Sequence, residues 1–297
     1  MEKPVSLSTL VWRRFRRHPG AIAGAIVLGA ITLSCLLAGL SPYDPYKTDL
    51  SSRLQPPSLE HPMGTDALGR DLLTRVLYGG RVSLSVGLMV MIITLLIGVP
   101  IGALAGYFGG KVDSTLMRIT DAFLSLPSLF VLIMLSAILR EIEAPLFESN
   151  MVLTIALVIG LLSWMMVARL VRISFLILRE QEFVIASRSL GATVLRMMTS
   201  HILPNAVGPI IVESTLEVGY AILEESGLSY LGFGIQPPTP SWGNLLSNAP
   251  EHMTDHPWLV IFPGLMIFLT IISINYIGDG LRDAFDPHKV LRKIGEV

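Results

Sequence analysis

The sequence predicts an all-α, polytopic membrane protein with six transmembrane helices. Of its 297 residues, 52% are hydrophobic and 15% are charged, and the mean hydropathy is +0.62. That composition is too apolar for an ordinary soluble domain. Long uncharged runs recur along the chain, separated by polar segments. The net charge of −1 shows no basic excess for nucleic-acid binding. The single cysteine, Cys35, excludes an internal disulfide and a cysteine-cluster metal site.

The first predicted span follows a basic amino-terminal segment. Residues 1–19 carry Lys3, Arg13, Arg14, Arg16 and Arg17, and residues 20–40 are uncharged. This run is longer than the apolar region of a secretory signal and has no convincing small-x-small cleavage site. It therefore predicts a retained transmembrane helix with its basic end in the cytoplasm.

Residues 41–81 are polar and rich in turn-forming residues, which predicts an extracytoplasmic segment. Five prolines exclude a long helix from its first half: Pro42, Pro45, Pro56, Pro57 and Pro62. In the second half, Asp66 to Arg81, apolar residues are spaced for one helical face. We expect this half to form a helix that lies on the membrane surface.

Residues 82–281 are expected to form a core of five spans. The second span is Val82 to Phe108, whose glycines repeat the small-x-x-x-small spacing that lets helices approach closely. The third is Ala122 to Leu139, broken by Pro127 after a short polar link. The fourth, fifth and sixth are Met151 to Ala168, a helix from near Asn205, and Pro257 to Ile277. Residues 282–297 form a tail.

The basic residues predict the orientation. With the amino terminus inside, sixteen of the 22 lysines and arginines lie on the inner side and six on the outer side. The positive-inside rule therefore places both termini and the segment between the fourth and fifth spans in the cytoplasm. Three outer residues, Arg70, Arg75 and Arg81, weaken the bias without reversing it, because arginines at a membrane surface can meet lipid phosphates.

The segment between the fourth and fifth spans, EFVIASRSLGATVLRMMTSHILPN from Glu182, is the clearest water-exposed surface in the sequence. Its pattern predicts a helix, a break at Gly191, a short amphipathic helix, and a proline, Pro204, that opens the next helix. Any cytoplasmic loop can be rich in arginine and hold a short helix, so amphipathicity alone is a weak indication of a partner.

The spacing within this segment resembles the EAA loop of ABC importer permeases. Ala186 and Ser187 occupy the two alanine positions, Gly191 the glycine, and Leu203 and Pro204 the L-P end; Ile185 and His201 depart from the pattern. The stretches GTDALGRDLLTRVLYGGRVSL, LSYLGFGIQPPTPSWGN and NYIGDGLRDAFDP resemble the C-type subunits of dipeptide and oligopeptide permeases. The resemblance therefore covers nearly the whole chain.

The resemblance implies the type I importer fold in a bacterial inner membrane. Residues 173–204 would be a coupling loop that sits in a cleft of a cytoplasmic ATPase. The implied partners are a B-type permease subunit, two ABC ATPase subunits and an extracytoplasmic substrate-binding protein. ATP and Mg would be bound by the ATPases, and this chain would bind no cofactor or metal of its own.

Within the coupling loop, apolar and basic residues would make the contact. Leu195, Met197 and Met198 offer soft apolar surface, and Arg188 and Arg196 offer charge-assisted hydrogen bonds. Gly191 would let two helical segments meet at a sharp angle, or would simply end a helix.

No motif indicates an enzyme. Gly110 and Lys111 are followed by Val112, so the sequence lacks a P-loop, and it contains neither H-E-x-x-H nor G-x-S-x-G. Asp279 in YIGDG resembles the aspartate of an intramembrane aspartyl protease, but no apolar run offers a second aspartate. The chain is therefore expected to be a transport subunit that hydrolyses nothing itself.

Four glutamates interrupt the fifth span: Glu213, Glu217, Glu224 and Glu225. At 100° per residue the first three share one face, and Glu225 lies beside it. Acids inside a span usually face a bundle interior or a watery cavity, so this face could line a path for a protonated amine or a metal cation. Alternatively, Glu213 lies at the cytoplasmic end and Glu225 pairs with an arginine of a partner subunit.

The outer loop Gly234 to Asn244 holds Pro237, Pro238, Pro240 and Trp242. Trp242 is either an interfacial anchor or, with Pro238 and residues 41–81, part of a platform where a binding protein docks, as the resemblance implies.

Dipeptide or oligopeptide uptake is the function that the resemblance favours. An importer of the same kind that carries nickel or another small solute is an alternative. A different alternative is a proton-coupled secondary transporter that uses Glu217 and Glu224. That alternative predicts an internal inverted repeat, which the sequence does not show.

Overall fold

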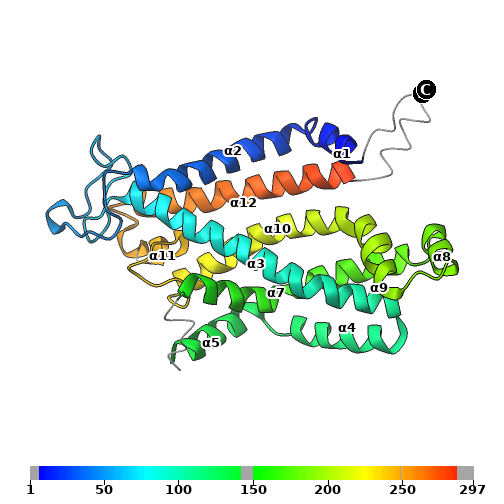
Figure 1. Cartoon of the computed structure of the whole chain (residues 1–297). Helices are drawn as coiled ribbons and strands as arrows, with labels where there is room; N and C mark the ends of the chain where they lie inside the picture. Colours follow the sequence, from blue (N-terminus) through cyan, green and yellow to red (C-terminus); the bar gives the residue numbers. More distant parts are fainter. Residues whose placement is uncertain (1–6, 142–149, 248, 286–297) are drawn as a thin grey trace.

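The computed structural model describes residues 7–141, 150–247 and 249–285, and all regular secondary structure in these ranges is helical. Five helical stretches are long and apolar enough to cross a membrane: Pro19–Leu40, Leu72–Phe108, Met151–Leu178, Val194–Tyr230 and Trp258–Phe285. The helices α4 (Gly110–Leu124) and α5 (Ser128–Glu141) form a pair bent by 81°, which makes a sixth if it counts as one span. The long helices form one elongated bundle (Figure 1).

The long helices begin at residues that satisfy their free N–H groups. Pro19 opens α2 (Pro19–Leu36), and Nδ1 of His18 accepts a hydrogen bond from Ala21 N at 3.0 Å. Asp71 caps α3 (Leu72–Phe108), and Asn150 caps α7 (Met151–Leu178) by accepting from Leu153 N at 3.1 Å. Pro204 is the second residue of α10 (Leu203–Tyr230), but it does not open a new helix as expected, because α10 continues directly from the helical segment Met197–Ile202.

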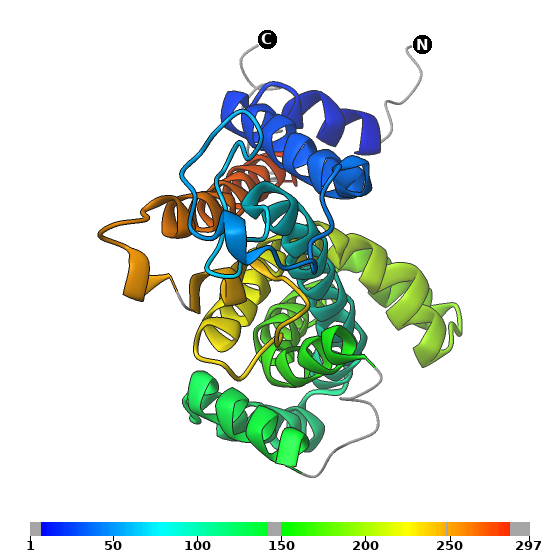
Figure 2. The same ribbon diagram turned by 90° about the vertical axis from the view of Figure 1, so that its left-hand side faces the viewer.

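The contact between α3 and α7 forms the centre of the bundle. A β-carbon at Gly98 would lie 2.8 Å from Trp164 O, and one at Gly106 would lie 2.6 Å from Arg172 O. Only glycine lets the two backbones come this close, which confirms the close approach expected from the glycine spacing. Beside this pair, α10 packs on α3, α7 and α12 (Trp258–Phe285), and α2 packs on α12. The pair α4 and α5 lies on the opposite flank (Figure 2).

The expected surface helix over Asp66 to Arg81 is wrong. The chain turns at Gly64, Gly69 and Asp71, and α3 then runs unbroken from Leu72 to Phe108. Its first turn is held in place by Arg75, which is only 2% exposed and whose Nη1 donates a hydrogen bond to Pro45 O at 2.8 Å. The residues from Leu72 onward therefore belong to the second span.

Other boundaries also differ from the sequence expectations. The polar link before the third span is helical, since α4 begins at Gly110, and the break falls at Pro127 as expected. The helices α7 and α12 end at Leu178 and Phe285, beyond the predicted ends at Ala168 and Ile277. Residues 1–6 and 286–297, part of the expected terminal segments, lie outside the described residues.

The two ends of the bundle differ. One end carries α1 (Leu7–Phe15), α8 (Glu182–Ser189), α9 (Val194–Arg196) and the last turns of α12 (Figure 1). The other carries residues 41–71, with the short 3-10 helix Leu50–Ser52, and the loop that holds α11 (Trp242–Ser247) and the 3-10 helix Pro250–His252. Both described chain ends therefore lie at the same end as α8 and α9.

Candidate coupling surface and transport path

The segment between α7 and α10 contains the predicted helix and the predicted break at Gly191. α8 ends at Ser189, and Gly191 follows with φ of +81°, a left-handed conformation that favours glycine. Thr193 caps the three-residue α9, a π-helical segment follows over Met197–Ile202, and α10 continues from it. The turn at Gly191 has open space around it, because an added β-carbon would meet no atom within 4 Å.

Three apolar side chains anchor this segment to the bundle. Val184 and Ile202 are fully buried and Met197 is 3% exposed, and all three pack in a cluster with residues of α3, α7 and α10. The expectation that Met197 offers contact surface to a partner is therefore wrong. It lies on the inner side of the π-helical segment, whereas Met198 is half-buried.

Three arginines at the C-terminal end of α7 bind this helix to α3 and α4. Arg172 forms a two-pronged ion pair with Asp113 of α4, with Nη2 to Oδ2 at 2.6 Å. Arg169 pairs with Asp121 at 2.5 Å, and Nη1 of Arg179 donates to Gly106 O at 3.0 Å. Ion pairs between guanidinium and carboxylate groups fix the geometry of a contact as well as stabilise it. The segment between α7 and α10 therefore starts from a helix end that is held rigidly.

Five apolar side chains of the segment are exposed. Leu190 is 89% exposed and Leu195 is 72% exposed. Phe183, Ile185 and Val194 are each exposed by more than two fifths. These five residues are here called the coupling surface. Of these five residues, only Leu195 was expected from the sequence to contact a partner, because helical spacing does not show which apolar side chains lack an apolar neighbour inside the protein.

The remaining predicted coupling residues lie in the same segment and differ in exposure. Ala186, Arg188, Arg196 and Pro204 are exposed, while Ser187 and Leu203 are half-buried. The hydroxyl of Ser187 donates to Phe183 O at 2.8 Å, inside α8. Exposed apolar and basic side chains therefore occur together on this segment, as they do in the core and rim of protein interfaces.

The four glutamates of α10 separate into two groups. Glu213 and Glu224 are half-exposed and Glu217 is 7% exposed. Glu225 is fully buried, where Ser83 and Ser229 donate hydrogen bonds to its carboxyl at 2.8 and 2.7 Å. The two serine hydroxyls accept in turn from Trp242 N at 3.2 Å and Ile235 N at 2.9 Å. Glu225 thus joins α3, α10 and the outer loop.

Trp242 is also inside the protein, which corrects both expectations for its side chain. It is 0% exposed, its Nε1 donates to Val76 O at 3.0 Å, and its ring packs beside Gly80. It is therefore neither an anchor in the lipid headgroups nor a direct contact for a partner. Pro238, in the same loop, is exposed.

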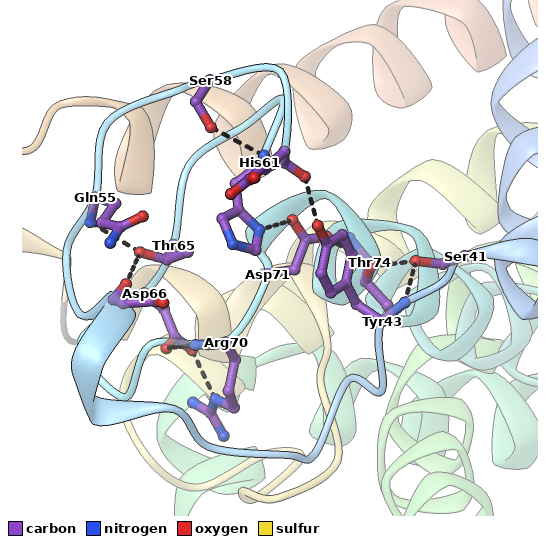
Figure 3. Close-up of polar contacts among 12 residues, drawn as sticks. Ser41, Tyr43, Gln55, Ser58, His61, Thr65, Asp66, Arg70, Asp71 and Thr74 are labelled. Carbon is purple, nitrogen blue, oxygen red and sulfur yellow. Dashed lines mark hydrogen bonds and ion pairs between the residues drawn. The ribbon is translucent and has the colours of Figure 1, made fainter.

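Residues 41–71, here called the cap, are ordered by a polar network (Figure 3). Nδ1 of His61 lies 2.9 Å from Asp71 Oδ1, and Asp71 Oδ2 accepts from the backbone and side chain of Thr74 at 2.8 and 2.6 Å. The Thr74 hydroxyl lies 2.5 Å from that of Ser41. The start of α3 is therefore bonded to both ends of the cap.

A second set of bonds centres on Asp66. Its Oδ1 accepts from Leu68 N and Arg70 N, and its Oδ2 accepts from Arg70 Nε at 2.7 Å. Arg75 Nε lies 3.4 Å from the same oxygen. At the cap surface, hydrogen bonds from Ser51 and Ser52 hold the pKa of Asp49 below its usual range.

A cavity of about 340 Å³ separates the cap from the outer loop. Charged and polar residues of the cap, of the first turn of α3 and of the outer loop line it: Arg53, Asp66, Arg70, Arg75, Asn244, Glu251 and His252. The two segments that the sequence named as a docking platform therefore meet around one polar cleft.

Known proteins resemble the chain over most of its length. The family model for the binding-protein-dependent transport system inner membrane component matches residues 98–290. The model for the N-terminal transmembrane domain of oligopeptide transport permease C matches residues 6–57. The dipeptide transport system permease protein DppC of Alkalihalophilus pseudofirmus is 41% identical over 277 residues, 93% of this chain and 88% of that protein.

Further similarity comes from a second relative and a solved structure. The oligopeptide transport system permease protein OppC of Bacillus subtilis is 40% identical over 291 residues, 96% of this chain and 92% of that protein. The inward-facing MetNI methionine ABC transporter matches with a TM-score of 0.57 and 19% identity, over 71% of this chain and 96% of that chain. This likeness shows a shared fold. The chain therefore belongs to the binding-protein-dependent transport system inner membrane component family, as a multi-pass ABC permease similar to DppC and OppC.

Proposed function

We propose that the chain forms half of the translocation path of an ATP-driven importer and receives the motion of an ATPase through the coupling surface. The observation that carries this proposal is the exposure of Leu190 and Leu195 on a segment whose base is fixed by buried residues and ion pairs. Exposed apolar side chains in such a protrusion are typical of a protein contact. Arg188 and Arg196 add charge-assisted bonds at its border.

In this mechanism the ATPase moves the coupling segment as a rigid body. The π-helical segment joins α9 to α10, so a push on α9 reaches the glutamates of α10 without an intervening loop. The whole half-channel then alternates between inward and outward access when ATP closes the ATPase dimer.

The working complex contains this chain, a B-type permease subunit, two ATPase subunits that bind ATP and Mg, and an extracytoplasmic binding protein. The coupling end, with both chain termini, faces the cytoplasm, because the basic residues gather there. The cap and the exposed Pro238 form the docking platform for the binding protein at the opposite end.

The substrates are dipeptides or oligopeptides, as the names of the relatives DppC and OppC indicate. Glu213, Glu217 and Glu224 would attract the protonated amino terminus of a peptide along the path. Glu225 is excluded from that role because its carboxyl is enclosed by serines.

The test is ATP-dependent peptide uptake in proteoliposomes that contain the chain with its partner subunits and binding protein. Replacement of Gly191→Asp is expected to lower uptake at least tenfold, because it strains a left-handed backbone position and alters the contact with the ATPase. Gly110→Asp is the matched control. Gly110 also has positive φ and open space around it, but it lies in α4 and is not one of the residues of the coupling segment.

The result contradicts the proposal if both variants lose uptake equally, or if uptake persists without ATP and follows a proton gradient. In the second case Glu217 and Glu224 become candidate proton sites. Replacing the peptide by nickel in the same vesicles tests the alternative cargo.

A further inference from the structure

Four arginines gather at the elbow between α1 and α2: Arg13, Arg14, Arg16 and Arg17. α1 ends at Phe15 and α2 begins at Pro19, so the arginines lie immediately before the first apolar span. Figure 2 looks along the bundle and shows α1 from its side, whereas the long helices are seen nearly end-on. α1 therefore runs across the bundle, in the direction of a membrane surface.

One side of α1 is fixed to the end of α12. Phe15 is 8% exposed and packs with Ala21 and Ala284. A β-carbon at Gly280 would lie 3.4 Å from the Phe15 ring, and Arg14 Nη1 donates to Ala284 O at 3.4 Å. Because this contact with α12 fixes the orientation of α1, the side chains on the opposite side of α1 point in a defined direction.

The other side carries Trp12, Arg13, Arg16 and Arg17, here called the elbow face. Trp12 is 57% exposed, and the guanidinium carbon of Arg16 lies 5.6 Å from the centre of its ring. The three arginines are exposed, and no carboxylate of the described residues forms an ion pair with them. The acids on the neighbouring end of α12 are Asp279 and Asp283.

This combination has a chemical preference. An amphipathic ring such as that of tryptophan favours the headgroup level of a bilayer. Guanidinium groups pair with phosphate oxygens through two parallel hydrogen bonds, and basic residues beside a span attract anionic lipids. A soluble protein partner would be expected to cover Trp12, but the elbow stands directly at the start of a span, where lipid is the adjacent medium.

We propose that the elbow face binds the phosphate headgroup of an anionic phospholipid in the leaflet on the coupling side of the membrane. Arg13, Arg16 and Arg17 contact the headgroup, and Trp12 lies at the glycerol level beside it. The lipid holds α1 flat and thereby fixes the end of α12 on which α1 packs. This site is separate from the coupling surface and does not depend on the identity of the cargo.

The test uses the assembled importer in nanodiscs of phosphatidylcholine that contain increasing fractions of brominated phosphatidylglycerol or brominated phosphatidylcholine. Bromine quenches nearby tryptophan, and the signal of Trp12 is the difference between the unchanged protein and Trp12→Phe. Quenching is expected at a lower fraction of the anionic lipid than of the neutral one. Each basic residue near an anionic surface contributes roughly a fivefold preference. Removing three charges in Arg13→Gln/Arg16→Gln/Arg17→Gln should therefore lower the preference at least about tenfold.

Lys111→Gln/Arg118→Gln is the control, because it removes two exposed basic residues of α4 and should leave the preference unchanged. Phe15 and Arg14 are retained in the triple variant, so α1 keeps its packing, which ATP-dependent peptide uptake by the same variant in proteoliposomes verifies. Equal quenching by both lipids, or an unchanged preference in the triple variant, overturns the proposal. So does displacement of the anionic lipid by inorganic phosphate beyond that by chloride at equal ionic strength, which would indicate a site for free anions.

Discussion

At the scale of single residues, the buried carboxyl of Glu225 shows how one side chain holds three elements together. Each carboxyl oxygen accepts from one serine, and each serine accepts from a backbone N–H of the outer loop. The loop has few other ways to satisfy these groups, because Ile235 and Trp242 are fully buried. Position 225 therefore stabilises the fold rather than lining a path.

Replacement of Glu225→Leu should leave two buried hydroxyls without their acceptor and lower the free energy of unfolding by about 2–5 kcal/mol. Glu225→Gln should cost less, since an amide retains one acceptor and adds a donor. Thermal unfolding in detergent measures both. Glu224→Leu is the control and should leave stability unchanged, because that side chain is half-exposed. A Glu225→Leu protein as stable as the unchanged one would refute this role.

Sequence reasoning grouped Glu225 with the other glutamates because helical spacing gives a direction and not a neighbour. Ser83, which lies 142 positions earlier, and the fold of the outer loop decide its role. The same limit applies to Trp242. A tryptophan among prolines in an outer loop favours a surface role, but Gly80 leaves a space on α3 that its ring fills.

At the scale of elements, the contact between α3 and α7 depends on glycine at successive turns. A β-carbon at Gly102 would overlap Ala168 O and lie 2.7 Å from Val171 Cβ. Backbone atoms of a long packed helix have little freedom to move away, so even one methyl group must separate the helices locally.

Gly102→Ala should therefore lower the free energy of unfolding by about 1–3 kcal/mol through overpacking. Gly29→Ala on α2 is the matched control, because a β-carbon there meets no atom within 4 Å. Resistance to unfolding by increasing SDS, followed by circular dichroism, compares the two. Equal resistance would mean that α3 and α7 are less closely packed than described.

The helices that the sequence predicted best are those whose ends carry a strong local signal. Gly191 marks the end of α8 through backbone geometry alone, and the structure places it as expected. Pro204 marks no boundary, because the helix that begins at α9 continues past it. The start of α3 was misjudged because it depends on distant partners. Arg75 fits inside the first turn of a span only because Asp66 and Pro45 O neutralise and bind its guanidinium group.

At the scale of the whole molecule, the segments that connect the long apolar helices gather at two opposite ends of the bundle. The cap, with Leu59 fully exposed, lies at one end, and the coupling surface, with Leu190, lies at the other. A membrane between them gives each end its own solvent compartment, and the basic residues favour the coupling end in the cytoplasm.

In a Cys35→Ser background, a membrane-impermeant maleimide should label Leu59→Cys in intact spheroplasts and Leu190→Cys only after permeabilisation. Both positions are exposed, so accessibility of the side chain does not limit either reaction. Loss of Cys35 should have little effect on background labelling, because that thiol is 1% exposed. The opposite labelling pattern would reverse the proposed orientation.

The pairing of α2 with α12 also constrains how the protein is made. Gly24 lies against Ser273 O, Ala21 lies against Gly280, and Trp258 Nε1 reaches the cap at Thr65 O. The first span to leave the ribosome, α2, thus packs against the last span, α12. While the intervening chain is being synthesised, the side of α2 that carries Gly24 lies in the membrane without α12. The cap cannot complete its contacts until translation has reached the final helix.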